Sequence, residues 1–565
     1  MRDPWQVAVQ ALKEEGIRFV FGLPGDPRNL YDALYDTPEI RTILVRHETS
    51  GVFMAMANAR LTGKPGVCFG SPGPGVANLV PGILEAYSAC TPLLAFCPTV
   101  STQTYGMGAF QEADQIPMLK PIAKWAIRLE NPERMPWLMR RAVSISWNGK
   151  PGPVVIEVPS NIGTTKADIE DYKPVRKPLR SRGDPTDIEE AARLILSSKS
   201  PILLAGGGVV LSGASKELLE LGELLSIPIF TTASGRGSIS EEHPLAMGLV
   251  GLYRTRVGKE VFESSDLIIS VGSRNEEFQS GNWKLKPAEA KFLQIDADPF
   301  EIGRNYLPDV AVVGDAKLVL KDIIDKLKSA AQTAKFLDGG RIKEITKAKQ
   351  HYLAEIEAEC TSHAERISSK NVVWTLNKLC GHDTILVNEN GSQDLWSYYY
   401  PYYRVLDAGD CIPPAEQTCM GFGVAAAIGA KLTRPDKKVI CTTGDGAFQM
   451  FMKELPTAVQ YSAPVTWVIL NNRSLGWIKA IQKATGGRYI ATDFDVQPDF
   501  VKIAEANKCH GERIEEQSEI EPAIKEALKA NAENVPAVLD FEVDPWSFPE
   551  GFKEFHSRIW GLQID

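Results

Sequence analysis

The stretch Lys438–Asn472, KVICTTGDGAFQMFMKELPTAVQYSAPVTWVILNN, constrains the fold of this chain more than any other. Its apolar residues 439–443 predict a strand that ends at Gly444-Asp445-Gly446, and residues 465–470 predict a second strand that ends at Asn471-Asn472. Between the two strands we expect a helix, because apolar residues recur close to the spacing of one buried helix face: Phe448, Phe451, Leu455 and Val459. A unit of this kind has parallel strands.

Polar residues follow both predicted strands. Because parallel strands end at one edge of a sheet, Asp445 and Asn472 are expected to converge there, with Gly446 freeing backbone amides at a helix start. Mg²⁺ prefers oxygen ligands and takes most of them from phosphate and water. The paired asparagines at this distance favour a magnesium diphosphate site over the alternative, a Rossmann-type turn with an acidic cap.

Length and composition limit the classes of protein. A chain of 565 residues is too long for one hydrophobic core and predicts about three domains. Hydrophobic residues at 44% and charged residues at 24% are ordinary globular values, which exclude wholesale disorder. The net charge of −9, without a basic run, argues against nucleic acid or an anionic membrane as the main partner.

The first residues, DPWQVAVQALKEEG, form a polar amphipathic segment without the apolar core of a signal peptide. No run reaches the roughly 18 to 20 apolar residues that span a bilayer. The nine cysteines include no CxxC pair, which is typical of reduced thiols. We expect a soluble, cytoplasmic protein.

Helix and strand patterns alternate along most of the chain, as in parallel sheets covered by helices on both faces. We predict an α/β fold with three doubly wound parallel-sheet domains over residues 1–163, 184–330 and 370–545, followed by a C-terminal tail, 546–565. A polar linker over about 161–186 and a charged, solvated helix within about 326–370 are expected to join these domains.

The GDG…NN pattern resembles the signature of thiamine diphosphate (ThDP) enzymes, and the surrounding sequence is most similar to the acetolactate synthase and pyruvate oxidase branch. The resemblance implies that the first domain binds the pyrimidine of ThDP and the third binds its diphosphate. It also implies that Asp445, the side chain of Asn472 and the backbone carbonyl of Ser474 ligate Mg²⁺. Three further residues are expected at the diphosphate: Gly444, Gly446 and Ala447.

Glu48 ends the predicted strand in RTILVRHE, at the carboxyl edge where doubly wound folds place chemistry. Its local alternative is a helix-capping carboxylate. RHE followed by A-x-A resembles the activating glutamate of ThDP enzymes, whose role is a hydrogen bond to the aminopyrimidine ring. The cofactor then carries the carbanion chemistry, and the protein tunes it.

Other segments resemble cofactor loops of the same family. Pro24 and Gly25 match its turn near the pyrimidine, although Asp26 stands where a second glycine is common, and Asn78 is retained in SPGPGVANL. AFQEAD resembles acetolactate synthases and implies that Phe110 and Gln111 line the substrate side. ENGSQDLW implies further contacts with the diphosphate through Gly391, Ser392 and Gln393.

Met420 lies in QTCMGFGVAAAIGAKL, where most small residues are expected to pack a core helix. In the resemblance Met420 is the apolar wedge beneath the cofactor, which bends its two rings toward each other.

The central domain leaves two interpretations open. FLQIDADPFEIG and VVGDAK resemble the versions of this domain that bind FAD, with Asp296 at the family's acidic position. SRNEEF replaces the F-D-D-R motif of acetolactate synthases, and a purely structural domain is the alternative.

We therefore predict a ThDP- and Mg²⁺-dependent enzyme that decarboxylates a 2-oxo acid and forms a new C–C bond, as acetolactate synthases do. The alternatives are a 2-hydroxyacyl-CoA lyase or acyl-CoA decarboxylase, an FAD-dependent pyruvate oxidase, and a catalytically silent homologue. Two features differ from acetolactate synthases. Ile481 stands where those enzymes have a tryptophan, and Trp477 lies one helical turn away. The chain also has a basic-aromatic tail, FHSRIW, which either closes over the active site or packs against the domain. The resemblance implies a homodimer or homotetramer with active sites between subunits.

Overall fold

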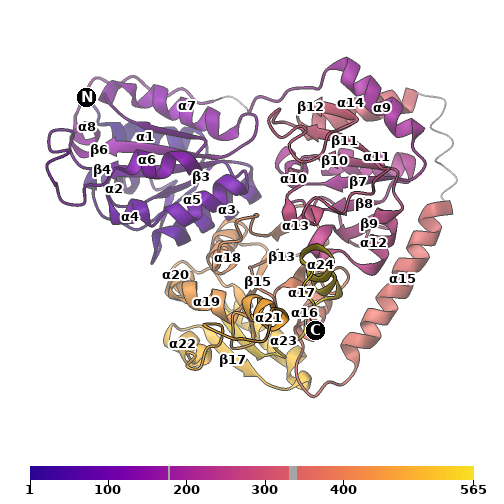
Figure 1. Cartoon of the computed structure of the whole chain (residues 1–565). Coiled ribbons are helices and arrows are strands. Elements are labelled where there is room, and N and C mark those ends of the chain that lie inside the picture. The colour runs from indigo at the N-terminus through magenta and orange to yellow at the C-terminus, as the bar shows by residue number, and fades with distance from the viewer. Residues whose placement is uncertain (176–177, 330–339, 565) are drawn as a thin grey trace. The chain divides into compact units, whose positions relative to one another are not determined.

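The computed structural model describes residues 1–175, 178–329 and 340–564 and contains three parallel six-stranded sheets (Figure 1). Contacts divide the chain into two compact units. The first unit comprises Met1–Leu179, Pro414–Pro435 and Met450–Val465, and the second comprises Arg180–Pro413, Asp436–Gln449 and Thr466–Asp565. All strand pairs in the three sheets are parallel within the described residues, and helices flank each sheet, so the predicted α/β fold with three parallel sheets is confirmed.

The first unit contains one sheet, with strand order β2-β1-β3-β4-β6-β5. Its strands are β1 Phe19–Gly22, β2 Arg41–Leu44, β3 Gly66–Phe69, β4 Leu93–Thr99, β5 Trp125–Arg128 and β6 Pro153–Pro159. Its helices are α1 Pro4–Glu14, α2 Arg28–Tyr35, α3 Glu48–Thr62, α4 Pro74–Ala77, α5 Val80–Ser88, α6 Gln115–Leu119, α7 Met135–Trp147, α8 Ser160–Thr164, α18 Phe422–Thr433 and α20 Leu455–Gln460.

Local sequence explains how these helices start and pack. Helix α1 begins with a capping box, in which the Asp3 carboxylate accepts from the backbone N–H of Gln6 and the Gln6 side chain accepts from the N–H of Asp3, both at 3.1 Å. Helix α18 lies so close to α3 that a Cβ on Gly429 would stand 2.4 Å from the carbonyl oxygen of Met54. The small residues of the QTCMGFGVAAAIGA run therefore serve close helix packing.

The second unit contains two sheets, ordered β12-β11-β10-β7-β8-β9 and β14-β13-β15-β16-β18-β17. The strands of the first are β7 Pro201–Ala205, β8 Ile229–Thr231, β9 Ala246–Leu249, β10 Leu267–Val271, β11 Lys291–Asp296 and β12 Val310–Val313. Those of the second are β13 Thr384–Val387, β14 Cys411–Ile412, β15 Lys438–Gly444, β16 Thr466–Asn471, β17 His510–Ile514 and β18 Ala537–Glu542. The main helices are α9 Pro185–Ser197, α11 Ser215–Leu225, α12 Arg256–Glu263, α14 Ala316–Ser329, α15 Gly340–Thr361, α16 Ser369–Leu379, α21 Gly476–Ala484, α22 Phe500–Ala506, α23 Ile520–Ala532 and α24 Glu550–Trp560. Four short helices complete it: α10 Gly207–Ser212, α13 Glu277–Ser280, α17 Leu395–Tyr398 and α19 Asp445–Phe451, of which only the last two residues fall in the first unit.

Two sequence predictions differ from the structure. The single helix expected after Gly446 is broken into α19, a 3₁₀ turn at Met452–Glu454, and α20, because Pro456 opens a new first turn and the carboxylate of Glu454 is buried. The connecting helix α15 is not simply solvated: one face is buried and carries Ile345, Lys349, Tyr352, Ile356 and Cys360. Residues 330–339 of this connecting stretch lie outside the described residues.

Within the described residues, no helix combines the length and apolar character needed to cross a membrane.

Candidate active site

Glu48 is the first residue of α3 and is 3% exposed. Its carboxylate lies at a helix N-terminus, where the backbone dipoles favour negative charge. The side-chain amide of Asn78, at the end of α4, donates to Glu48 Oε2 at 3.0 Å. A Cβ on Gly75 would stand 2.9 Å from Glu48 Oε1, so the absence of a side chain there keeps space beside this oxygen. The structure thus brings together two residues that the sequence singled out separately.

The turn that contains Pro24 and Gly25 lies at the same edge of this sheet. It follows β1, and a Cβ on Gly25 would stand 2.4 Å from Cβ of Ser71. Ser71 in turn borders Gly75, where an added Cβ would stand 2.5 Å from the Ser71 hydroxyl. Gly25, Asn78 and Glu48 therefore surround one small region of the first unit.

The loop that carries Phe110 and Gln111 is organised by a single carboxylate. The backbone amides of Gly106, Gly108 and Ala109 all donate to Glu112, and these hydrogen bonds lower the pKa of that carboxyl group. Phe110 is 88% exposed, and Gln111 has φ of 61°. The carbonyl oxygen of Gln111 faces Gly73, where a Cβ would stand 2.6 Å away, so this loop borders the SPGPG turn.

Met420 is half-buried and precedes Gly421, the N-cap residue of α18. The segment before it is held by a buried carboxylate from α5: Glu85 accepts from the backbone N–H of Ala415 at 2.6 Å and of Cys419 at 2.9 Å. Burial raises the pKa of Glu85, which is 0% exposed. No motif marks this glutamate in the sequence; its one signal is that it is the single acidic residue in the apolar run LVPGILEAYSA.

In the second unit, the carboxyl ends of β15 and β16 lie side by side as predicted. Gly444 is in register with Leu470, so Asp445 and Asn471 follow at neighbouring positions. Asp445 is 1% exposed, and burial raises its pKa to about 7 against the lowering effect of a hydrogen bond from Gln497. Gly444 leaves open space at this edge, since a Cβ there would meet nothing within 4 Å, and Ala447 is buried.

Asn472 and the loop 391–393 meet around Gly476. A Cβ on Gly476 would stand 2.4 Å from both Asn472 Nδ2 and the hydroxyl of Ser392. Asn472 Oδ1 accepts from the backbone N–H of Ser474 at 3.2 Å, and the buried Ser474 hydroxyl has no hydrogen-bond partner.

The neighbouring Gln393 side chain points into the interior. It accepts from Ser369 at 2.6 Å and donates to the carbonyl of Pro545 at 3.3 Å. Gly391 meets no atom within 4 Å at the position of a Cβ. Any contact of loop 391–393 with a diphosphate is therefore left to Ser392 and to the backbone.

The oxygen atoms of Asp445, Asn472 and Ser474 at the carboxyl edge of β15 and β16 are suitable ligands for Mg²⁺. In the described part of the chain no three His, Cys, Asp or Glu side chains form a metal cluster. The edge of β15 and β16 offers instead one buried carboxylate with amide and carbonyl oxygens nearby, the few protein ligands that Mg²⁺ takes when phosphate and water supply the others. A cation beside Asp445 would also offset the burial that raises the pKa of this carboxyl group.

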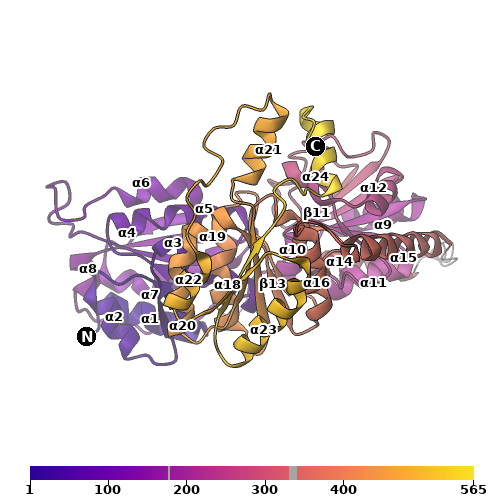
Figure 2. The same cartoon turned by 90° about the horizontal axis from the view of Figure 1, so that it is seen from below.

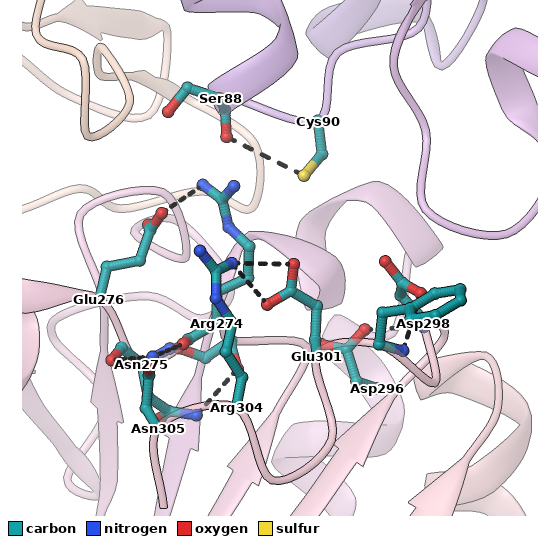
Figure 3. Close-up of polar contacts among 12 residues, drawn as sticks. Ser88, Cys90, Arg274, Asn275, Glu276, Asp296, Asp298, Glu301, Arg304 and Asn305 are labelled. Carbon is teal, nitrogen blue, oxygen red and sulfur yellow. Dashed lines mark hydrogen bonds and ion pairs between the residues drawn. The ribbon is translucent and has the colours of Figure 1, made fainter. Parts of the chain in front are cut away.

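The central sheet has its own polar edge in the second unit (Figure 3). Arg274 in the SRNEEF segment pairs with Glu276 at 2.8 Å, and Arg304 pairs with Glu301 at 3.1 Å. Asp296 accepts from the backbone N–H of Asp298 at 2.9 Å.

Among the described residues of this domain, Glu217 Oε2 on α11 is buried without a hydrogen-bond partner, and so are two further atoms, Thr231 Oγ1 and Gln279 Oε1. The Val250–Gly251 turn contacts both residues: the Val250 N–H donates to the Thr231 carbonyl at 3.1 Å, and a Cβ on Gly251 would stand 2.5 Å from Cα of Gln279. These two unpartnered atoms are suited to hydrogen bonds with a polar ligand.

The C-terminal tail packs against α21 (Figure 2). The Trp477 ring lies 5.0 Å from Phe552 and 5.7 Å from His556 of α24, and 5.9 Å from Phe278. Trp477 therefore anchors the tail within the second unit. Five tyrosines in the segment YYYPYY are buried as well: Tyr398, Tyr399, Tyr400, Tyr402 and Tyr403. The Tyr398 ring stacks on that of Tyr253, with 4.8 Å between the ring centroids.

Fold and site together define an enzyme of the thiamine diphosphate class, and comparison with known proteins agrees. Models of the thiamine pyrophosphate enzyme family match in chain order: the N-terminal TPP binding domain at residues 5–118, the central domain at 188–323 and the C-terminal TPP binding domain at 389–541. The chain belongs to the thiamine pyrophosphate enzyme family.

Within this family the chain belongs to the acetolactate synthase branch. It is 37% identical to a "Probable acetolactate synthase large subunit" of Methanococcus aeolicus, over 96% of this chain and 92% of that protein. It is 36% identical to the protein with the same description in Methanocaldococcus jannaschii, with the same coverage. It is 32% identical to "Acetolactate synthase isozyme 3 large subunit" of Escherichia coli (strain K12), over 95% and 94%. The resemblance inferred from GDG…NN is confirmed.

Proposed function

We propose that this protein is a ThDP- and Mg²⁺-dependent enzyme that decarboxylates one 2-oxo acid and joins the remaining acyl group to a second. One carboxylate leaves as CO₂, the acyl carbon bonds to the carbonyl carbon of the second molecule, and that carbonyl oxygen takes a proton. The observation that carries this proposal is the similarity to acetolactate synthase large subunits along nearly the whole chain, with the candidate residues at the sheet edges.

Glu48 is the proposed activating residue. Asn78 donates to its Oε2, which fixes the carboxyl group and leaves Oε1 beside Gly75 for a hydrogen bond to the aminopyrimidine. Burial strengthens such a hydrogen bond, because the local dielectric is low. When bound, ThDP supplies the nucleophilic carbon and the electron sink for breaking the bond next to a carbonyl. Met420 is the proposed wedge, and Phe110 and Gln111 are the proposed substrate-side residues.

Asp445, Asn472 and Ser474 are the proposed Mg²⁺ ligands, and the diphosphate is proposed to lie over Gly444, Gly446, Ala447 and loop 391–393. Pro24 and Gly25 are proposed to border the pyrimidine. The buried Asp445 carboxylate supports this assignment, because a buried charge needs a paired cation or hydrogen bonds. The domain boundaries, the cytoplasmic location and FAD stay predictions.

We also propose a homodimer or homotetramer with active sites between subunits. Two apolar side chains of the substrate-side loop support it, since Phe110 is 88% exposed and Met107 is 77% exposed. The two residues lie three positions apart in this loop, and exposed apolar patches are typical of protein–protein interaction sites. Burial of this loop by a second copy would place Phe110 and Gln111 in a protected site.

The test is reconstitution of the apo protein with ThDP and Mg²⁺, followed by product analysis with pyruvate. The proposal predicts acetolactate and one CO₂ per two pyruvates, with no product when either cofactor is omitted. Peroxide release together with flavin absorbance would establish a pyruvate oxidase instead. A protein that is inert to pyruvate but cleaves a 2-hydroxyacyl-CoA would contradict the proposal in favour of a lyase.

A further inference from the structure

Gln497 lies behind the candidate magnesium ligand Asp445, in a segment that carries no recognisable motif. The segment after α21 folds back along the loop 473–475. The backbone N–H of Leu475 donates to the carbonyl oxygen of Thr492 at 2.8 Å, and the backbone N–H of Phe494 donates to the carbonyl oxygen of Arg473 at 3.0 Å. This pairing brings Gln497 to the end of β15, where its amide Nε2 donates to Asp445 Oδ2 at 2.7 Å.

The amide of Gln497 is itself held by Asn471, the first of the paired asparagines. Asn471 Nδ2 donates to Gln497 Oε1 at 3.0 Å, and Gln497 Nε2 donates back to Asn471 Oδ1 at 3.2 Å. Asn471 Nδ2 also donates to Asp540 Oδ1 at 2.8 Å, and Arg513 Nε donates to Asp540 Oδ2 at 3.2 Å. The chain of contacts from Arg513 to Asp445 is continuous.

This network decides which groups are available to a metal. The side-chain oxygen of Gln497, Oε1, accepts a hydrogen bond from the Asn471 amide. The side-chain oxygen of Asn471, Oδ1, accepts from Gln497 Nε2 and, at 3.1 Å, from the backbone N–H of Arg473. Both amide oxygens are therefore engaged within the protein. Asp445 Oδ2 accepts from Gln497, and backbone N–H groups of Asp445 and Gly446 also hydrogen-bond to this carboxylate. Gln497 is therefore the side chain that helps to fix the rotation of the carboxyl group toward a cation.

We propose that Gln497 is a positioning residue that orients Asp445 for Mg²⁺, with Asn471 and Asp540 as its support; this inference rests on the proposed function. Mg²⁺ demands a tight octahedral geometry, so a carboxylate that is free to rotate binds it less well. Removing a hydrogen-bond partner of a metal ligand typically lowers metal affinity by about 10- to 100-fold. Gln497 acts through Asp445 and does not contact the metal.

The test compares Mg²⁺ binding by the wild type and Gln497→Met, in the full chain with saturating ThDP, by titration of tryptophan fluorescence. Methionine keeps the length of the side chain and removes all three of its hydrogen bonds. We expect the Kd for Mg²⁺ to rise about 10- to 100-fold, with kcat largely recovered at saturating Mg²⁺. Gln517→Met is the matched control, since Gln517 makes two hydrogen bonds of 3.0 Å, to Ala364 and Ser362.

The outcomes separate the inference from the proposed function. If the wild type binds no Mg²⁺ with ThDP, the proposed function fails and the inference with it. If the wild type binds Mg²⁺ and Gln497→Met binds it within twofold, Gln497 is only structural and the inference alone is overturned. Gln497→Asn, which keeps an amide but is too short to reach both partners, must weaken Mg²⁺ binding in the same direction if Gln497→Met does not fold.

Discussion

The buried carboxylate of Glu85 offers a sharp test of how the segment before Met420 is held. In the substitution Glu85→Gln the side chain keeps its shape but replaces one acceptor oxygen with an NH₂ donor. The backbone N–H groups of Ala415 and Cys419 both donate to this carboxylate. Glutamine can accept only one of these bonds and faces the other N–H with a donor.

The magnitude follows from the unpaired N–H group. A buried donor without a partner costs about 1–3 kcal/mol, and we expect the free energy of unfolding of Glu85→Gln to fall by this amount. The same free energy can instead lower the population of the conformation that presents Met420 to the cofactor. In that case kcat/KM falls by about 5- to 150-fold, since each 1.4 kcal/mol is a factor of ten. Lowered kcat with unchanged ThDP affinity is the expected pattern.

The assay combines steady-state kinetics, ThDP titration and chemical denaturation. Glu526→Gln is the control, because Glu526 is 54% exposed on α23 and pairs with the exposed Lys529 at 3.0 Å. Its effect on the free energy of unfolding should stay within about 0.5 kcal/mol. A Glu85→Gln protein that is less stable but has the kcat and KM of the wild type would refute the link between Glu85 and Met420.

Three further substitutions test other parts of the account. Gly476→Ala should lower ThDP- and Mg²⁺-dependent activity at least about tenfold, because the new Cβ would stand 2.4 Å from the Asn472 amide. Gly381→Ala is the control, since a Cβ there would have no atom closer than 3.8 Å. Equal activities of the two variants would contradict the predicted geometry. Ser474→Ala should leave the Kd for Mg²⁺ within about twofold, since the proposed ligand is the backbone carbonyl and the buried hydroxyl has no partner; a larger loss would assign the hydroxyl to the metal. Lys349, 7% exposed on α15, has its pKa lowered by burial to about 8 from 10.5. Between these pH values the unfolded chain binds more protons, so this residue adds stability as pH rises, up to roughly 3 kcal/mol; denaturation curves of Lys349→Met should lack this rise, and parallel pH profiles would show the reasoning to be wrong.

Much of the fold follows from sequence periodicity, because alternating strands and helices permit few arrangements other than parallel sheets. The strands on either side of Gly444-Asp445-Gly446 occur within one residue of their predicted bounds. Apolar spacing predicts one continuous helix between them, and spacing alone does not show that Pro456 and the buried Glu454 divide it. Likewise the charged composition of α15 concealed a buried face.

The candidate site was predictable where chemistry is concentrated in a motif. Glu48, Asn78, Asp445 and Asn472 stand in short runs with characteristic neighbours, and the structure brings Glu48 next to Asn78. Gln497 could not be found in this way, because it lies 52 residues from Asp445 and its role depends on how a loop folds back.

The central claim is that Glu48 activates bound ThDP, and its most direct test is the exchange of the C2 proton of ThDP for deuterium, followed by NMR after rapid acid quench. Wild type and Glu48→Gln are compared at ThDP and Mg²⁺ concentrations that saturate both. The account predicts that Glu48→Gln still binds ThDP but exchanges the proton about 10²- to 10⁴-fold more slowly, the usual contribution of a positioned acid–base group. Equal exchange rates in the two proteins would contradict it.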